Sequence, residues 1–84
     1  MRQKKIHEYT VKFVPNDIGG WRVIVPSLPE VQTEGRTFGE AQEMAAEAIA
    51  LCLKVRAEDR KEIPRDVDYK AVGEPKFLKL EVAV

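Results

Sequence analysis

The sequence predicts an α+β fold with the order β-β-β-α-β: an antiparallel meander of three strands, one helix packed across the sheet, and a C-terminal fourth strand. Apolar residues alternate with polar ones in short stretches near both ends, and glycine and proline residues separate these stretches. One long stretch between them has apolar residues at helical spacing. A chain of 84 residues has room for one core, so we expect a single domain over 1–84.

The N-terminal part predicts a flexible arm followed by a strand. Residues 1–7 carry a local excess of basic side chains, namely Arg2, Lys4, Lys5 and His7. This excess suits either a phosphate-contacting arm or a solvated terminus, and we expect the latter. From Tyr9 to Val14, apolar and polar residues alternate as in a strand with one buried face. The arm is therefore expected to end just before this strand.

A hairpin loop and a second strand follow. Residues 15–20 include Pro, Asn, Asp and the pair Gly19 and Gly20, all of which favour turn dihedrals. In the stretch 21–25, Trp21 and two valines point one way and polar or aliphatic residues the other. This stretch is the second predicted strand, antiparallel to the first.

Prolines end the second strand. Proline has no N–H to donate to a neighbouring strand, so the strand stops at Pro26. Pro26 and Pro29 enclose Leu28 in a turn. Residues 31–35 then predict a short third strand that ends in a glycine turn at Gly35.

A capped helix begins after this turn. Thr37 suits the N-cap and Glu40 lies three residues later, so each side chain can accept a backbone N–H in a capping box just before Ala41. A charged stretch containing Pro64 places the helix end near Arg60. The predicted core stripe consists of Phe38, Ala41, Ala45, Ala48, Ile49, Cys52 and Val55, widened by Met44, Leu51 and Leu53.

The fourth strand follows a further turn. Gly73 and Pro75 predict that turn, and the stretch from Phe77 to Val84 alternates again, with its leucines and valines on one face. This strand completes the predicted sheet.

Composition excludes several classes of protein. The chain has 14 basic and 14 acidic side chains, so it lacks the cationic excess of non-specific nucleic-acid binders. Its single cysteine, Cys52, excludes an internal disulfide and fits a reducing compartment. No apolar run approaches the length of a membrane span, so we expect a cytoplasmic protein without membrane contact.

Several residues are candidates for binding a partner. Lys12, Arg22, Ile24 and Arg36 are predicted to share the sheet face away from the helix, where they form either a docking surface or an ordinary solvated face. Met44 and Leu51 fall at the margin of the helix stripe and can serve a second protein surface. Trp21 is either a core residue facing the helix, which we favour, or an exposed anchor for a partner.

The order of these motifs resembles the HicB-like antitoxin family. The resemblance rests on Gly19-Gly20-Trp21, Val25-Pro26-Ser27-Leu28-Pro29, Thr33-Glu34-Gly35 and Thr37-Phe38-Gly39-Glu40-Ala41, with Ala45-Ala46-Glu47-Ala48-Ile49 and Glu62-Ile63-Pro64 further on. The chain departs from the family at Glu30-Val31, where members often have a pair such as Gly-Cys. The resemblance covers roughly Tyr9 to Pro64.

This resemblance implies a partial ribonuclease H-like fold and a protein that neutralises a small HicA-like mRNA interferase. Family members commonly carry a C-terminal ribbon-helix-helix or helix-turn-helix module. Each needs two helices and the sequence predicts one, so we expect no autonomous operator binding. Exposed strand edges favour a homo-oligomer, either a dimer or a tetramer. The alternative function is a nucleic-acid-binding adaptor that uses its lysines and arginines on phosphate.

No catalytic set is apparent, and we expect neither an enzyme nor a cofactor or metal site. A ribonuclease H-like nuclease clusters carboxylates around metal ions, one of them within the first strand. Here Glu8 precedes that strand, Asp17 lies in the loop, and the helix carboxylates have no histidine or aspartate placed beside them. Cys52 is expected to be a buried, inert thiol, because the one histidine, His7, is remote in sequence.

Overall fold

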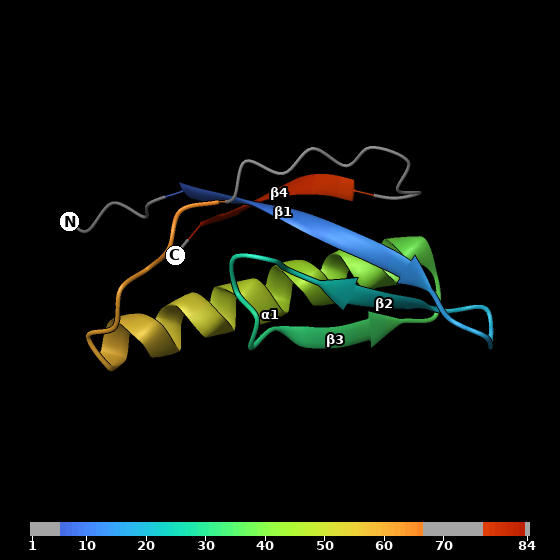
Figure 1. Ribbon diagram of the computed structural model, residues 1–84, viewed down its shortest axis with the longest axis horizontal. Coiled ribbons are helices and arrows are strands. Elements are labelled where there is room, and N and C mark those ends of the chain that lie inside the picture. Colours follow the sequence, from blue (N-terminus) through green and yellow to red (C-terminus); the bar gives the residue numbers. More distant parts are fainter. Residues whose placement is uncertain (1–5, 67–76, 84) are drawn as a thin grey trace.

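The computed structural model describes residues 6–66 and 77–83, which form one antiparallel sheet and one helix (Figure 1). The elements are β1 (Ile6–Pro15), β2 (Trp21–Ile24), β3 (Gln32–Gly35), α1 (Phe38–Glu58) and β4 (Phe77–Ala83). The sheet order is β3-β2-β1-β4, with every neighbouring pair antiparallel. This confirms the predicted α+β fold. The predictions for Arg2, Lys4, Lys5, Gly73, Pro75 and Val84 lie outside the described residues.

β1 is longer than the alternating pattern predicted. Ile6 and His7, which the sequence assigned to a flexible arm, pair with Ala83 and Val82 of β4. The imidazole of His7 is half-buried and stacks on the ring of Tyr9, with centroids 6.5 Å apart. The arm prediction was wrong for these two residues, because β4, more than 60 positions away in sequence, supplies the partners that order them.

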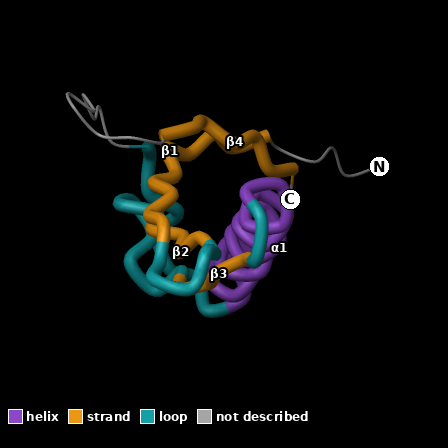
Figure 2. The backbone as a smooth tube through the Cα atoms, turned by 90° about the vertical axis from the view of Figure 1, so that its right-hand side faces the viewer, coloured by secondary structure: helices purple, strands orange, loops and turns teal. Residues whose placement is uncertain are grey.

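The sheet curves and the helix closes its open side. Seen end-on, the four strands form an arc, and α1 lies across the opening next to β3 (Figure 2). Side chains from both layers fill the space between them. The buried apolar residues are Tyr9, Val11, Phe13, Val23, Val25, Leu28, Val31, Ala41, Ala45, Ile49, Leu53 and Val82.

The buried stripe of α1 is narrower than predicted and follows a different row. Its buried residues, Ala41, Ala45, Ile49 and Leu53, lie four positions apart, so they form one ridge that packs on the sheet. Leu53 is 1% exposed and belongs to the core, whereas Val55, which was assigned to the core, is 47% exposed. A row with spacing four turns slowly around the helix, and Phe38, Ala48 and Cys52 pack against the core beside it while only partly buried.

Backbone and side-chain caps hold both ends of α1. The Thr37 hydroxyl accepts the Glu40 N–H at 3.0 Å, and the Glu40 carboxylate accepts the Arg36 N–H at 3.1 Å. At the other end Arg60 has a positive φ of 57°, and the Lys61 N–H reaches the Arg56 carbonyl at 2.8 Å. This is a Schellman-type end, which stops the helix at Glu58.

The predicted turns have the backbone geometry that their residues favour. Gly19 has a φ of 89°, and the Asn16 side chain accepts the Ile18 and Gly20 N–H groups at 3.1 and 2.8 Å. After β2, the Leu28 N–H bonds the Val25 carbonyl at 2.9 Å, and Leu28 itself is fully buried. The proline-flanked turn therefore contributes a core side chain as well as a change of direction.

Candidate protein-interaction surfaces

The outer side of β2 and β3 carries a mixed apolar and polar surface. Because the Cα partners are Arg22 with Glu34 and Ile24 with Gln32, these four side chains lie together on the sheet face opposite α1. We call them the outer β2–β3 face. A hollow of about 390 Å³ lies beside them and reaches Pro26 and Pro29. Ile24 is half-buried there, while Arg22, Gln32 and Glu34 are exposed.

One residue predicted on this face, Arg36, has another position. Arg36 lies in the connection between β3 and α1, outside the sheet, and its N–H bonds Glu40. Trp21 faces the helix side, where its ring meets Phe38 edge-on with centroids 5.3 Å apart. Its packing against the core corresponds to the core role that the sequence favoured. Lys12 is the β1 partner of Ile24 in the ladder and is half-buried.

A second surface lies along one side of α1. Met44, Leu51 and Val55 are 37%, 63% and 47% exposed, and Ala48 between them is half-buried. We call these four residues the apolar flank of α1. A groove of about 540 Å³ runs between this flank and the start of β3, and Val31 and Gln32 line its opposite wall. The sequence placed Met44 and Leu51 at the stripe margin but assigned Val55 to the core.

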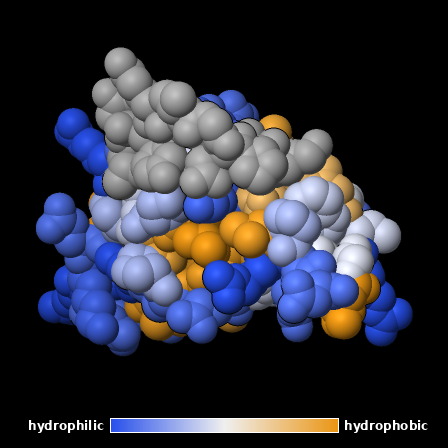
Figure 3. All heavy atoms as spheres, turned by 45° about the vertical axis from the view of Figure 1, so that its right-hand side comes forward, coloured by the Kyte–Doolittle hydropathy of each residue, from blue (hydrophilic) through white to orange (hydrophobic). Residues whose placement is uncertain are grey.

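Hydrophobic atoms reach the surface in patches bordered by hydrophilic side chains, as the space-filling view shows (Figure 3). The most exposed large hydrophobe among the described residues is Ile18, at 92%, in the β1–β2 loop. Sequence analysis did not single it out, because a lone aliphatic residue in a polar loop carries no periodic signal.

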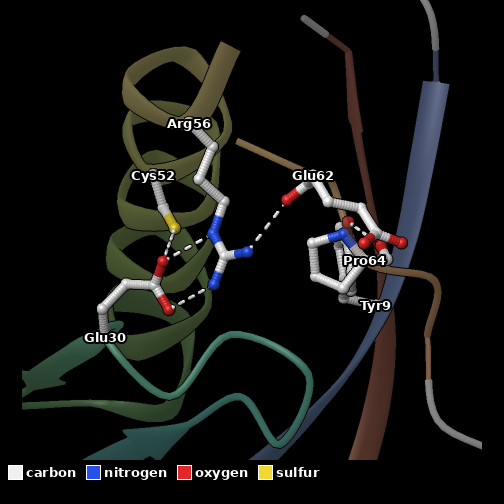
Figure 4. A network of polar contacts seen from close by, with 6 residues as sticks. All are labelled: Tyr9, Glu30, Cys52, Arg56, Glu62 and Pro64. Carbon is white, nitrogen blue, oxygen red and sulfur yellow. Dashed lines mark hydrogen bonds and ion pairs between the residues drawn. The ribbon is translucent and has the colours of Figure 1, made fainter. Parts of the chain in front are cut away.

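A polar cluster that the sequence did not predict consists of Glu30, Cys52 and Arg56 (Figure 4). The Arg56 guanidinium donates to both carboxylate oxygens of Glu30, at 2.6 and 2.8 Å. The thiol of Cys52 donates to the same carboxylate at 3.2 Å. Glu30 directly follows the proline turn, at the position where the chain departs from the HicB-like pattern. This departure has a structural role, because the Glu30 side chain links the β2–β3 loop to α1.

Cys52 is half-buried rather than fully buried. Burial raises the pKa of its thiol, and the hydrogen bond to the Glu30 carboxylate raises it further. A thiol held in the protonated form is a weak nucleophile at neutral pH. That Cys52 is inert stays a prediction.

The segment after α1 runs along the N-terminal half of β1. The Tyr9 hydroxyl donates to the Pro64 carbonyl at 2.6 Å, and Arg56 donates to the Glu62 carbonyl at 3.0 Å. The Asp66 carboxylate accepts the Thr10 N–H and hydroxyl, both at 2.7 Å. Because β2 stops at Ile24, this segment takes its place beside β1.

The hydrogen bonds that Asp66 accepts favour the ionised form of its carboxyl group. Burial acts to raise its pKa, but the hydrogen bonds from the Thr10 backbone and hydroxyl and from Lys79 outweigh burial and lower it. The Lys79 ammonium lies 3.2 Å from the carboxylate. An ionised Asp66 therefore satisfies an N–H that no strand reaches.

The Glu30–Arg56 pair gives a pH-dependent prediction. The hydrogen bond from Arg56 is the main cause that lowers the pKa of Glu30 from 4.5 to about 2 in the folded protein. The ionised carboxylate therefore stabilises the fold above pH 4.5, and this contribution disappears as the pH falls towards 2. We expect a Glu30→Gln variant to lose less stability than the parent chain between pH 4.5 and 2, measured by urea unfolding.

A matched variant tests this assignment. Glu58→Gln changes an exposed glutamate in the last turn of α1 and should leave the acid profile of the parent chain unchanged. Equal acid profiles for Glu30→Gln and the parent would show that this pair does not contribute.

Neither a metal site nor a membrane span is found in the described part of the chain. Within residues 6–66 and 77–83, no group of three or more His, Cys, Asp or Glu side chains is placed to hold a metal ion. The helix described there is not long and apolar enough to cross a membrane.

Comparison of sequences identifies two similar curated proteins. The chain is 45% identical over 56 residues to Antitoxin HicB 2 of Photorhabdus laumondii subsp. laumondii, and 39% identical over 56 residues to Antitoxin HicB 1 of the same organism. These matches cover 67% of this chain and 40% and 36% of the two relatives. The chain thus spans about two fifths of the length of the relatives it matches. No protein-family model matches it.

Comparison of folds identifies solved structures that are similar to this one. The N-terminal domain of Burkholderia pseudomallei antitoxin HicB superposes with a TM-score of 0.70 at 23% identity, covering 92% of this chain and 96% of that domain. The longer structure of the same antitoxin gives a TM-score of 0.69 at 22% identity, covering 92% of this chain and 62% of that one. At these identities the likeness shows a shared fold.

Proposed function

This chain is a HicB-like domain, related in sequence to curated HicB antitoxins and in fold to a HicB N-terminal domain, and from this we propose that it neutralises a HicA-like toxin. The toxin is a small mRNA interferase, and the chain acts on it by protein–protein contact rather than by catalysis. The similarity to the two curated antitoxins is the observation that carries this proposal.

We assign the toxin contact to the outer β2–β3 face. Ile24 and the hollow beside it supply an apolar centre, and Arg22, Gln32 and Glu34 surround it with hydrogen-bonding groups. An apolar centre with a polar rim is the usual anatomy of a protein interface. The only helix among the described residues, α1, packs on the opposite face, so it does not cover this surface.

The same face does not favour the nucleic-acid adaptor. Phosphate binding needs uncompensated positive charge, and Glu34 lies directly across the ladder from Arg22. We also propose no operator-binding role for residues 6–66 and 77–83, which hold one helix where the known two-helix DNA-binding motifs need two. We place the complex in the cytoplasm, where messenger RNA is translated.

A binding experiment tests this function. A tagged chain should retain a small protein from nuclease-treated extract of the native cells, and co-expression of the two should relieve the growth arrest that this small protein causes alone. An Ile24→Glu substitution places a charge at the centre of the face and should weaken the complex roughly 30-fold or more, measured by calorimetry.

The control is Ile18→Glu, which changes an exposed isoleucine in the β1–β2 loop and should bind like the parent. If no small protein is retained, the antitoxin function is contradicted. If Ile24→Glu binds and rescues as well as the parent, the toxin contact lies elsewhere on the chain.

A further inference from the structure

The apolar flank of α1 has the residue spacing of a helix-packing seam. Met44, Ala48, Leu51 and Val55 are separated by four, three and four positions. An alternation of three and four is the pattern by which one helix packs along another. At about 100° per residue, the four side chains fall within roughly 60° of arc on the helix.

This seam is separate from the row that packs on the sheet. The row formed by Ala41, Ala45, Ile49 and Leu53 is buried, whereas three of the four flank residues are exposed. The core therefore does not explain why the flank is apolar. An exposed apolar strip beside a groove of about 540 Å³ is typical of a surface that a second protein covers.

The flank is complementary to itself in size when two copies run antiparallel. In one register Met44 meets Val55 of the second copy, and Leu51 meets Ala48 of the second copy. By symmetry each contact occurs twice, so all four residues find a partner. The large Leu51 lies over the small Ala48, which lets the two helices approach closely.

The flank is also complementary to itself in charge. Glu47 and Lys54 border it on the solvent side, and both are exposed. Neither forms an ion pair with any side chain in the described ranges 6–66 and 77–83. Antiparallel packing brings Glu47 of one copy beside Lys54 of the other, twice. In parallel packing about a two-fold axis, the edges that carry Glu47 and Lys54 would lie on opposite sides of the contact, so these charges would not meet.

We propose that two copies of this chain form a dimer through the apolar flank, with their α1 helices antiparallel. The groove between α1 and β3 borders the flank, and Val31 and Gln32 of the same chain form its far wall. The dimer leaves Arg22, Ile24 and Glu34 of the outer β2–β3 face free, whereas Gln32 borders both surfaces.

Sedimentation equilibrium of the purified full chain over a range of concentrations tests the dimer. The parent chain should dimerise, and Leu51→Glu should raise the dimer dissociation constant at least tenfold while leaving the circular dichroism spectrum unchanged, because Leu51 is 63% exposed. Ile18→Glu is the matched control and should dimerise like the parent. A parent chain that stays monomeric, or a dimer unaffected by Leu51→Glu, would overturn the proposal.

Charge exchange tests the orientation. Glu47→Lys and Lys54→Glu should each weaken the dimer, and the double variant should restore it, because opposite charges then face each other again. In a Cys52→Ser background, Ala48→Cys and Leu51→Cys chains should form mixed disulfides with each other on oxidation. Preferential Leu51→Cys self-linkage, or no restoration by the double variant, would contradict antiparallel packing.

The same variants separate this dimer from the toxin contact. Leu51→Glu should still bind the retained small protein, and Ile24→Glu should still dimerise. If Leu51→Glu abolished binding of the small protein and the parent chain were monomeric, the flank would be the toxin surface and the dimer would be refuted.

Discussion

Replacing Gly35 with alanine is expected to destabilise the fold by about 3 kcal/mol, at the upper end of the usual cost of overpacking. Gly35 ends β3 and lies against the first turn of α1. A Cβ atom built there would sit 2.7 Å from the Ala41 Cα and 2.9 Å from the Glu40 carbonyl carbon, and closer still to the Ala41 nitrogen. These are backbone atoms, so no side-chain rotation relieves the clash, and strand and helix must separate.

Gly39→Ala is the matched control for this prediction. A Cβ atom at Gly39 meets only the Thr37 hydroxyl, at 4.0 Å. The residue lies in the first turn of α1, where alanine is preferred to glycine, so the substitution should stabilise the fold by up to about 1 kcal/mol. Urea unfolding of both variants measures the change in the free energy of unfolding that each substitution causes. Equal effects would mean that β3 and α1 are not in close contact at Gly35.

Replacing Ile49 with alanine is expected to cost about 3 to 4 kcal/mol of unfolding free energy. Ile49 is fully buried, in the middle of the ridge of α1 that packs on the sheet. The substitution loses the transfer free energy of three carbons and leaves a cavity that the sheet cannot fill without bending. Much of the stability of a small domain depends on a few such side chains.

Ile18→Ala makes the same chemical change at a position that is 92% exposed and should cost less than about 0.5 kcal/mol. Chemical denaturation at one protein concentration compares the two. If Ile49→Ala were as mild as Ile18→Ala, the buried row of α1 would be misplaced.

The elements with strong local patterns were predictable from the sequence. Thr37 and Glu40 mark the helix start because a cap depends on residues within one turn. Gly19 and Pro26 mark turns because they restrict or free their own dihedrals. The element order β-β-β-α-β followed from these signals together.

Long-range contacts were not predictable in the same way. Glu30 and Arg56 lie 26 positions apart, and Thr10 and Asp66 lie 56 apart, so neither pair leaves a periodic trace. The apolar flank was half predicted: Met44 and Leu51 stood at the stripe margin, but Val55 looked like a core residue. One apolar stripe on a helix does not tell which part of it the sheet covers.

The sequence by itself determined the strands, the turns, the capped helix and the family likeness, because each depends on dihedral preferences and side-chain periods within a few residues. Only the tertiary structure decided that β4 pairs with β1, that the 61–66 segment takes the place of β2, and that Leu53 rather than Val55 enters the core. These outcomes depend on how the curved sheet and α1 meet. That geometry arises from contacts between residues far apart in the chain, which no local pattern encodes.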